Sequence, residues 1–139
     1  MSAPIVLEAP VPLGVRERLR GLAAVGTARV ILTATRGHPA RIRAVLRILR
    51  TGASPADLAA AVRARGCVTT VSLRCASDHG CLLRSVAIVV ACRLAGRTVV
   101  WRVGTVSPPP SSHAWVEAAG VPAGEPFDPR LLYSPIMTV

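Results

Sequence analysis

Two residue types that together carry out acyl chemistry, a cysteine and a histidine, lie in the second half of this 139-residue chain. Cys81 follows a glycine and opens a long apolar stretch, and His113 opens the pentapeptide His-Ala-Trp-Val-Glu. A cysteine attacks a carbonyl group as its thiolate, so it needs a nearby base, usually a histidine that a third group holds in orientation. The pair therefore suggests a cysteine-dependent enzyme.

The sequence places Cys81 at the start of a helix. The polar segment Ser77–Gly80 is expected to be a loop, and the stretch Cys81–Leu94 is apolar and long enough to predict a buried helix rather than a strand. Unpaired N–H groups and the helix dipole at that end would lower the pKa of the thiol and face an oxyanion. Cys92, deep in the same stretch, and Cys67 are interpreted as buried structural cysteines.

The third group is expected to come from a hairpin that follows His113. The segments His113–Ala118 and Val121–Glu125 have the character of strands, with a turn near Ala119 and Gly120. If the hairpin is centred on Ala119, the residue opposite His113 is Glu125, on the same face of the sheet. A carboxylate there would fix the tautomer of the imidazole.

Other interpretations of these residues remain open. Asp128, three positions beyond Glu125, is the alternative orienting acid, and Glu117 is expected to be a solvent-facing or strand-end charge. A metal site is a further alternative, and its ligands would be Cys67, Cys75, His79 and Cys81. We expect no metal, because these spacings lack the Cys-x-x-Cys pairs of structural zinc sites.

Composition limits the class of partner. The net charge is +10, and all 17 basic residues are arginine. The chain has no recognisable nucleic-acid-binding motif, and one Phe and one Tyr give no platform for base stacking, so an acidic protein or peptide is a more plausible partner than nucleic acid. The basic face within Arg41–Arg50 is a candidate docking surface, although for any single arginine a solvated face is the better explanation.

We expect a cytoplasmic protein with reduced cysteines. The first twelve residues lack the charged-then-apolar layout of a signal peptide, and the longest apolar run, Val86–Cys92, is far too short to span a membrane.

The expected elements give an α+β fold of one domain, 1–139, mainly helical over 1–66 and with the catalytic helix and strands over 67–139. Met1–Pro12 is expected to be an extended arm. Helices are expected over Leu13–Thr35, with interruptions at Gly21 and Gly26, over Pro39–Arg50, and from an N-cap at Ser54 to Gly66. Strands are expected over Val68–Leu73, Thr98–Val103, His113–Ala118, Val121–Glu125 and Leu132–Val139.

Two motifs resemble those of a known family. Gly-Cys-Leu-Leu-Arg-Ser-Val-Ala over residues 80–87, followed by His-Ala-Trp-Val-Glu over 113–117, is similar to the transglutaminase-like leader peptidases of lasso-peptide biosynthesis. Gly96 after the helix and Gly104 after the first strand fit the same pattern. The similarity covers about residues 81–126.

The resemblance implies a transglutaminase-like or papain-like fold and a cysteine protease that removes the leader of a ribosomally made precursor, without metal or cofactor. Its triad would be Cys81, His113 and Glu125, where the family more often has aspartate as the third member. The chain would be the split form, whose partners are the precursor peptide, a separate leader-recognition protein and an ATP-dependent cyclase. A non-catalytic peptide-binding module of the same fold and a transglutaminase-like acyl transferase are the alternatives.

Overall fold

The computed structural model describes residues 6–139, and the first five residues of the predicted arm lie outside this range. The helices are α1 (Val15–Ala34), α2 (Pro39–Arg50), α3 (Leu58–Val71), α4 (Leu73–Ala76) and α5 (Cys81–Leu94). A four-stranded antiparallel sheet has the order β5-β4-β3-β6, with β3 (Val100–Val106), β4 (Ser111–Ala118), β5 (Val121–Pro122) and β6 (Ser134–Thr138). The short strands β1 (Ser54–Pro55) and β2 (Arg97–Thr98) pair in parallel. The predicted α+β class is confirmed.

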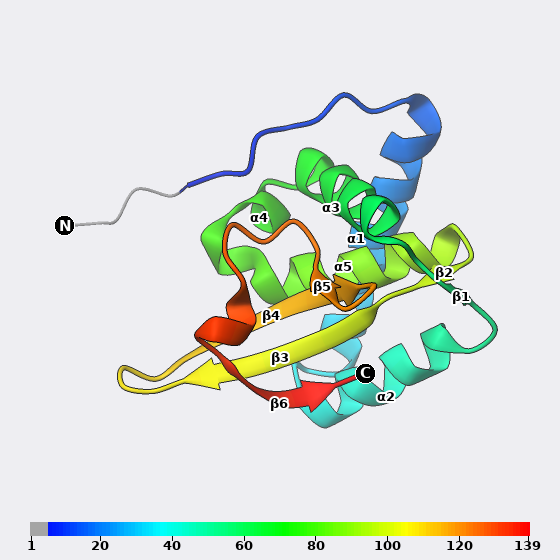
Figure 1. The fold of residues 1–139 in the computed structure, drawn as a ribbon. Coiled ribbons are helices and arrows are strands. Elements are labelled where there is room, and N and C mark those ends of the chain that lie inside the picture. Colours follow the sequence, from blue (N-terminus) through cyan, green and yellow to red (C-terminus); the bar gives the residue numbers. More distant parts are fainter. Residues whose placement is uncertain (1–5) are drawn as a thin grey trace.

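Helix α5 is the centre of the core. Its residues from Arg84 to Cys92 are all buried, and the helix contacts α1 and α3 as well as β3 and β4 of the sheet (Figure 1). The indole Nε1 of Trp101 on β3 donates to Ser85 Oγ on α5 over 3.0 Å, so the hydroxyl of this buried serine has a partner. The helix that carries Cys81 is therefore fixed between the helical layer and the sheet.

The predicted interruption of the first helix is wrong, since α1 runs unbroken through Gly21 and Gly26. Gly21 is needed for packing: a Cβ there would lie 2.7 Å from the backbone oxygen of Cys67, so α1 and α3 approach closely at this point. Gly26 has no neighbour within 4 Å of such a Cβ. Helix-helix contact therefore accounts for one of these glycines, and nothing in the structure explains the other.

The third helix differs from the prediction at both ends. Ser54 and Pro55 form β1, and the N-cap is Asp57, whose carboxylate accepts from the N–H of Ala60 over 2.7 Å. The helix also continues past Gly66 to Val71, so the strand expected over Val68–Leu73 is helix instead. A Cβ on Gly66 would lie 2.9 Å from the side chain of Val11, so this glycine makes room for the N-terminal arm and does not end the helix.

The described part of the arm is extended and attached along its length. Leu7 forms an isolated antiparallel bridge with Ser77, and the N–H of Glu8 donates to the carbonyl of Ala76 over 3.0 Å. Further along, the N–H of Val11 donates to Thr70 Oγ1. The arm thus lies across the C-terminal end of α3 and the segment that leads to Cys81.

The sheet consists of four strands that the sequence predicts, with shifted ends: β4 begins two residues earlier than expected, and β6 lies within the predicted Leu132–Val139. β3 pairs with β4 from Val100↔Glu117 to Val106↔Ser111, and β6 pairs with the other side of β3. The hairpin between β4 and β5 turns at Ala119 and Gly120, which both have positive φ, as a two-residue hairpin loop requires. The second strand is shorter than expected: its paired residues end at Pro122, the N–H of Ala123 makes one more bond to the carbonyl of Val116 over 2.9 Å, and Gly124 then turns the chain away.

Candidate active site

Cys81 is the first residue of α5 and is held there by a turn that only glycine fits. A Cβ on Gly80 would lie 1.7 Å from the backbone oxygen of Arg74, so any other residue would displace the backbone. The preceding short 3₁₀ turn, Asp78–Gly80, replaces the loop expected from sequence. Two carbonyls of this segment, those of Cys75 and Ser77, accept from the Arg84 guanidinium over 2.9 and 3.0 Å. The approach to the thiol is thus rigidly fixed.

His113 lies on β4 in a cluster of three rings with Trp115 and Tyr133, whose own centroids are 6.5 Å apart. Its ring stacks on Trp115 with a centroid separation of 5.9 Å and an interplanar angle of 15°, and the Tyr133 ring lies 5.4 Å away. Opposite His113, Gly104 on β3 leaves the space that the rings occupy, since a Cβ there would lie 2.8 Å from Tyr133 Cβ and 3.0 Å from the indole. The orientation of the imidazole is therefore set by packing as well as by hydrogen bonds.

The structure brings Glu125 and His113 together. Glu125 Oε2 lies 2.9 Å from His113 Nε2, and the side chain of the glutamate is only 3% exposed. The contact does not arise from strand pairing as predicted. The two-residue turn gives a register centred between residues 119 and 120, and the last ladder bond comes from the N–H of Ala123. Gly124, with φ of 69°, then turns the chain so that Glu125 reaches the imidazole from a loop.

Asp128, the alternative acid, has a different partner. Its carboxylate pairs with the guanidinium of Arg130 over 2.7 Å and accepts from the N–H of the same residue. This acid caps a short 3₁₀ turn, Pro129–Leu131, near the surface. Glu125 is thus the carboxylate that meets the histidine.

The electrostatics favour a thiolate–imidazolium pair. Burial by itself would raise the pKa of the Cys81 thiol, but hydrogen bonds from His113 and from the backbone N–H of Ala114 bring that pKa below its ordinary value of 9.0. Burial opposes the charge on His113 too, yet its hydrogen bonds to Cys81 and Glu125 raise its pKa from 6.5 to about 9. Since Nε2 faces the glutamate, the other ring nitrogen, Nδ1, is the one left for the sulfur.

The other cysteines lack this environment. Burial raises the pKa of Cys92 to about 11 and also raises the pKa values of Cys67 and Cys75. All four cysteines are free thiols. Within residues 6–139, no cluster of three or more His, Cys, Asp or Glu side chains is arranged to hold a metal ion, so the alternative of a site at Cys67, Cys75, His79 and Cys81 has no geometric support.

A small apolar cavity adjoins the thiol and the imidazole. Its volume is about 180 Å³, and besides Cys81 and His113 it is lined mainly by apolar side chains from α2, α5, β3 and β6. These include Leu82, Val103 and Met137. A cleft of this kind can hold one side chain of a peptide beside the reactive sulfur.

Comparison with known proteins agrees with this arrangement. Residues 23–138, a range that includes Cys81, His113 and Glu125, match the family model described as "Transglutaminase-like superfamily". The chain belongs to the transglutaminase-like superfamily. Members of this superfamily are in general cysteine proteases or acyltransferases, which is the chemistry that the thiol, imidazole and carboxylate can perform. No curated protein and no solved structure matches the chain.

In this transglutaminase-like domain, sequence reasoning missed the residues behind the candidate triad. Arg65 on α3 is buried, and its Nη1 lies 2.8 Å from Glu125 Oε1 and also donates to the carbonyl of Ala123. Glu8 of the arm accepts from the same guanidinium. A buried arginine in the middle of a helix has no sequence signal beyond an arginine-rich background, because its partners come from the arm and from a loop.

The expectation for Glu117 is wrong. Its side chain is buried, accepts from the indole Nε1 of Trp115 over 3.0 Å, and forms an ion pair with Arg102 over 3.0 Å. Alternation along β4 places His113, Trp115 and Glu117 on one face, so a signal existed: a carboxylate two positions from a buried indole can accept its N–H. Glu117 thereby fixes the ring on which His113 stacks.

Among the described residues, no helix is both long and apolar enough to cross a bilayer.

Proposed function

We propose that this transglutaminase-like protein is a cysteine endopeptidase that removes the leader from a ribosomally synthesised lasso-peptide precursor. The observation that carries the proposal is that Cys81 and His113 line the same apolar cavity, while the Nε2 atom of His113 lies 2.9 Å from Glu125 Oε2. The motifs at residues 80–87 and 113–117, which resemble those of leader peptidases, support the choice of substrate. Superfamily membership supports thiol chemistry but not this particular substrate.

The mechanism starts from the thiolate–imidazolium pair that the two pKa shifts favour. The Cys81 thiolate attacks the carbonyl carbon of the last leader residue, and the negative charge moves to the carbonyl oxygen, which the N–H of Cys81 at the start of α5 can stabilise. The imidazolium of His113 protonates the amine of the core peptide, the C–N bond breaks, and the leader remains as a thioester on Cys81. Neutral His113 then takes a proton from a water as its oxygen attacks the thioester; the C–S bond breaks, the leader leaves with a carboxylate, and the Cys81 thiolate and the His113 imidazolium are restored.

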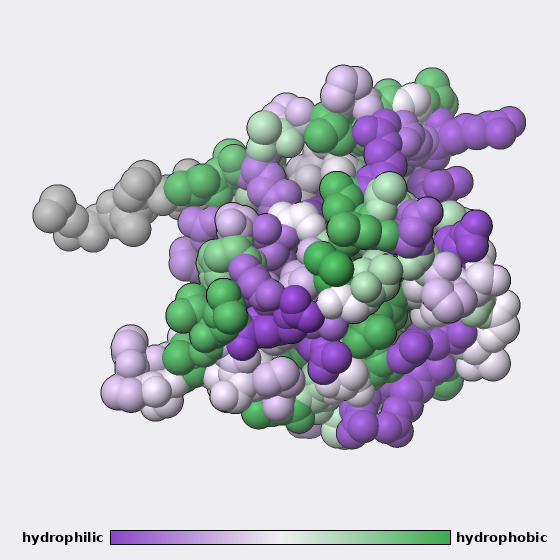
Figure 2. All heavy atoms as spheres, in the orientation of Figure 1, coloured by the Kyte–Doolittle hydropathy of each residue, from purple (hydrophilic) through white to green (hydrophobic). Residues whose placement is uncertain are grey.

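Partners of acidic character suit the surface charge. Among the arginines of α2, Arg41, Arg47 and Arg50 are exposed, and hydrophilic side chains occur over much of the face shown in Figure 2. We propose that the precursor, a separate leader-recognition protein and the ATP-dependent cyclase associate with this domain in the cytoplasm, and that α2 docks an acidic surface. Reversing charge at Arg47 and Arg50 should then weaken partner binding, with little change in reactivity of Cys81 towards a small alkylating reagent.

The direct test is leader release from a candidate precursor in the presence of the recognition protein, followed by mass spectrometry. Cleavage is expected with the native protein and should be lost in Cys81→Ala, whereas Cys92→Ala is the matched control and should retain it. Cleavage by Cys81→Ala that equals the native rate would refute the proposal. A non-catalytic binding module would also bind the precursor, but alkylation of Cys81 would leave its function unchanged.

Acyl transfer to an amine is the second candidate, because the superfamily includes acyltransferases. The two outcomes differ in the product. Hydrolysis in ¹⁸O-labelled water places one labelled oxygen in the new carboxylate of the leader, whereas transfer joins the leader to an added primary amine and incorporates no label. Labelled leader as the main product, even with millimolar amine present, is the result that we expect.

A further inference from the structure

The candidate site has two halves, Glu125 with His113 and Cys81 with the segment before it, and a buried arginine supports each. Arg65 on α3 lies behind Glu125, and Arg84 on α5 holds the segment that leads to Cys81. The two guanidiniums come from different helices, and each is almost fully buried. A buried guanidinium requires a compensating negative charge. A carboxylate that lies against both arginines would therefore connect the two halves of the site.

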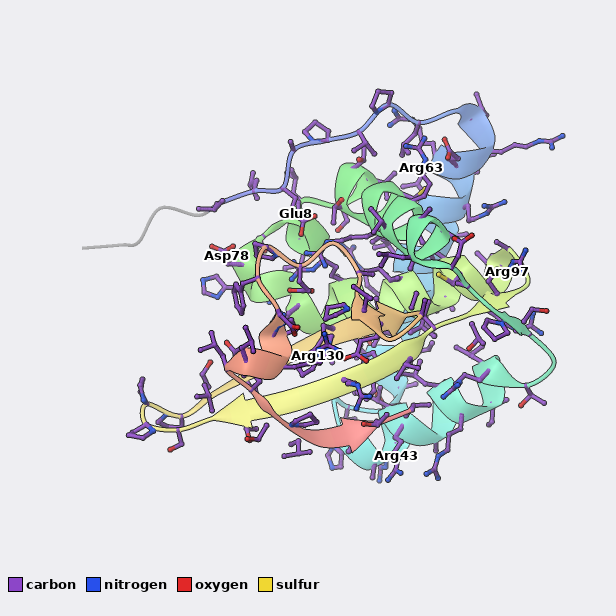
Figure 3. The ribbon with its side chains drawn as sticks, in the orientation of Figure 1. Glu8, Arg43, Arg63, Asp78, Arg97 and Arg130 are labelled. Atoms are coloured by element: carbon purple, nitrogen blue, oxygen red, sulfur yellow. The ribbon has the colours of Figure 1, made fainter. Side chains whose placement is uncertain are left out.

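Glu8 is the carboxylate that both arginines contact. Its Oε2 accepts from Arg65 Nε over 3.1 Å, its Oε1 accepts from Arg65 Nη2, and the same Oε1 lies 3.9 Å from Arg84 Nη1. The backbone of Glu8 is fixed as well, through its N–H to Ala76. Figure 3 shows this side chain pointing from the arm towards the helices beneath it.

The charges of this cluster balance once Glu8 is included. Cys81 as thiolate, Glu125 and Glu8 carry three negative charges, while His113 as imidazolium, Arg65 and Arg84 carry three positive ones. The path of Arg65 through the cluster is closely fitted, since a Cβ on Gly124 would lie 2.5 Å from Arg65 Cδ. Glu8 also lies outside the residues 23–138 that match the superfamily.

We propose that Glu8 is a positioning residue: by bridging Arg65 and Arg84, the N-terminal arm holds the Glu125–His113 half of the site in register with Cys81. The inference rests on the proposed function for its meaning in catalysis. Arg65 is directed to one oxygen of Glu125, which leaves the other for His113 Nε2. Loss of the bridge frees both guanidiniums to move, and the hydrogen bond from His113 to the sulfur is weakened as a result.

The test measures the reactivity of Cys81 in the full chain, which requires no peptide substrate. The rate of iodoacetamide labelling is followed as a function of pH, with the Cys81 peptide quantified by mass spectrometry. In Glu8→Gln the apparent pKa of Cys81 should rise by about one unit, which slows labelling about tenfold at pH values below that pKa. Glu17→Gln, which removes the exposed ion pair between Glu17 and Arg63, is the matched control and should change the rate by less than about twofold.

The direction of the shift separates positioning from simple charge. Removing a negative charge near a thiolate by itself lowers the pKa of the thiol. An apparent pKa that is unchanged or lowered in folded Glu8→Gln therefore overturns the proposal. Glu8→Asp keeps the charge but shortens the side chain, so it should also raise the apparent pKa; a native profile in this variant would likewise contradict the bridge.

Failure of this inference is distinguishable from failure of the proposed function. If native Cys81 has an ordinary thiol pKa, the proposed mechanism itself is wrong. If native Cys81 is activated and Glu8→Gln behaves like the native protein, only the positioning role is lost. With a cleavable precursor, Glu8→Gln should lower kcat by about 10- to 100-fold with little change in KM, because misplaced catalytic groups slow the chemical step rather than binding.

Discussion

At the scale of single residues, the reactivity of Cys81 depends on whether the proton lies on its sulfur or on His113. The pKa of the thiol is lowered below its ordinary 9.0 and that of the imidazole is raised to about 9, and both shifts favour the pair of thiolate and imidazolium. Labelling of Cys81 by iodoacetamide should therefore begin below pH 9 in the native protein. In His113→Ala the thiol loses the imidazole, which lowers its pKa more than any other group, while burial still raises it, so labelling should require a pH of 9 or above. A profile that His113→Ala leaves unchanged would contradict the pair.

The choice between the two acids can be tested by removing each charge with little change in shape. Glu125→Gln should lower the cleavage rate by about 10²-fold or more, because an amide does not stabilise the imidazolium. The alkaline limb of the pH–rate profile, which reports loss of the proton from His113 near pH 9, should also move to lower pH. Asp128→Asn is the matched control and should remain within about twofold of native, since its partner is Arg130. The reverse order of effects would make Asp128 the orienting acid.

Two glycines of α1 provide a matched test at the scale of the elements. Gly21→Ala would place a methyl group 2.7 Å from the backbone oxygen of Cys67, and the required movement of α1 from α3 should lower the free energy of unfolding by about 1–3 kcal/mol. Gly26→Ala meets no atom within 4 Å and should raise it by about 0.5–1 kcal/mol, because alanine loses less backbone entropy in a helix. Thermal denaturation of the two variants measures both values. Equal effects of the two substitutions would show that the helices do not pack as described.

At this scale, a feature could be predicted from the sequence when neighbouring residues determine it, and could not when a contact distant in the sequence determines it. The helix that begins at Cys81 and the hairpin turn at Ala119 and Gly120 follow from local apolar patterning and turn chemistry, and both are confirmed. The prediction that Gly66 ends the helix is wrong because this glycine makes room for Val11, more than fifty residues away in the sequence. The prediction of Glu125 depends on a strand register that the structure does not have, and a loop brings this residue to His113 instead. Arg65 had no local signal, since its partners come from the arm and from a loop.

On the scale of the whole molecule, the helical part and the sheet share one core, because α5 contacts α1 and α3 on one side and β3 and β4 on the other. A chain with one core should unfold in a single cooperative step. Two probes report on different parts: helices dominate the far-ultraviolet circular dichroism, whereas both tryptophans, Trp101 and Trp115, lie in the sheet and report through fluorescence. In the native protein the two denaturation curves should coincide. In Gly21→Ala both curves should shift together, although residue 21 lies far from either tryptophan in the sequence. Two separate transitions would mean that the chain unfolds as two units. Cys81, on α5, and His113, on β4, would then belong to units that unfold independently.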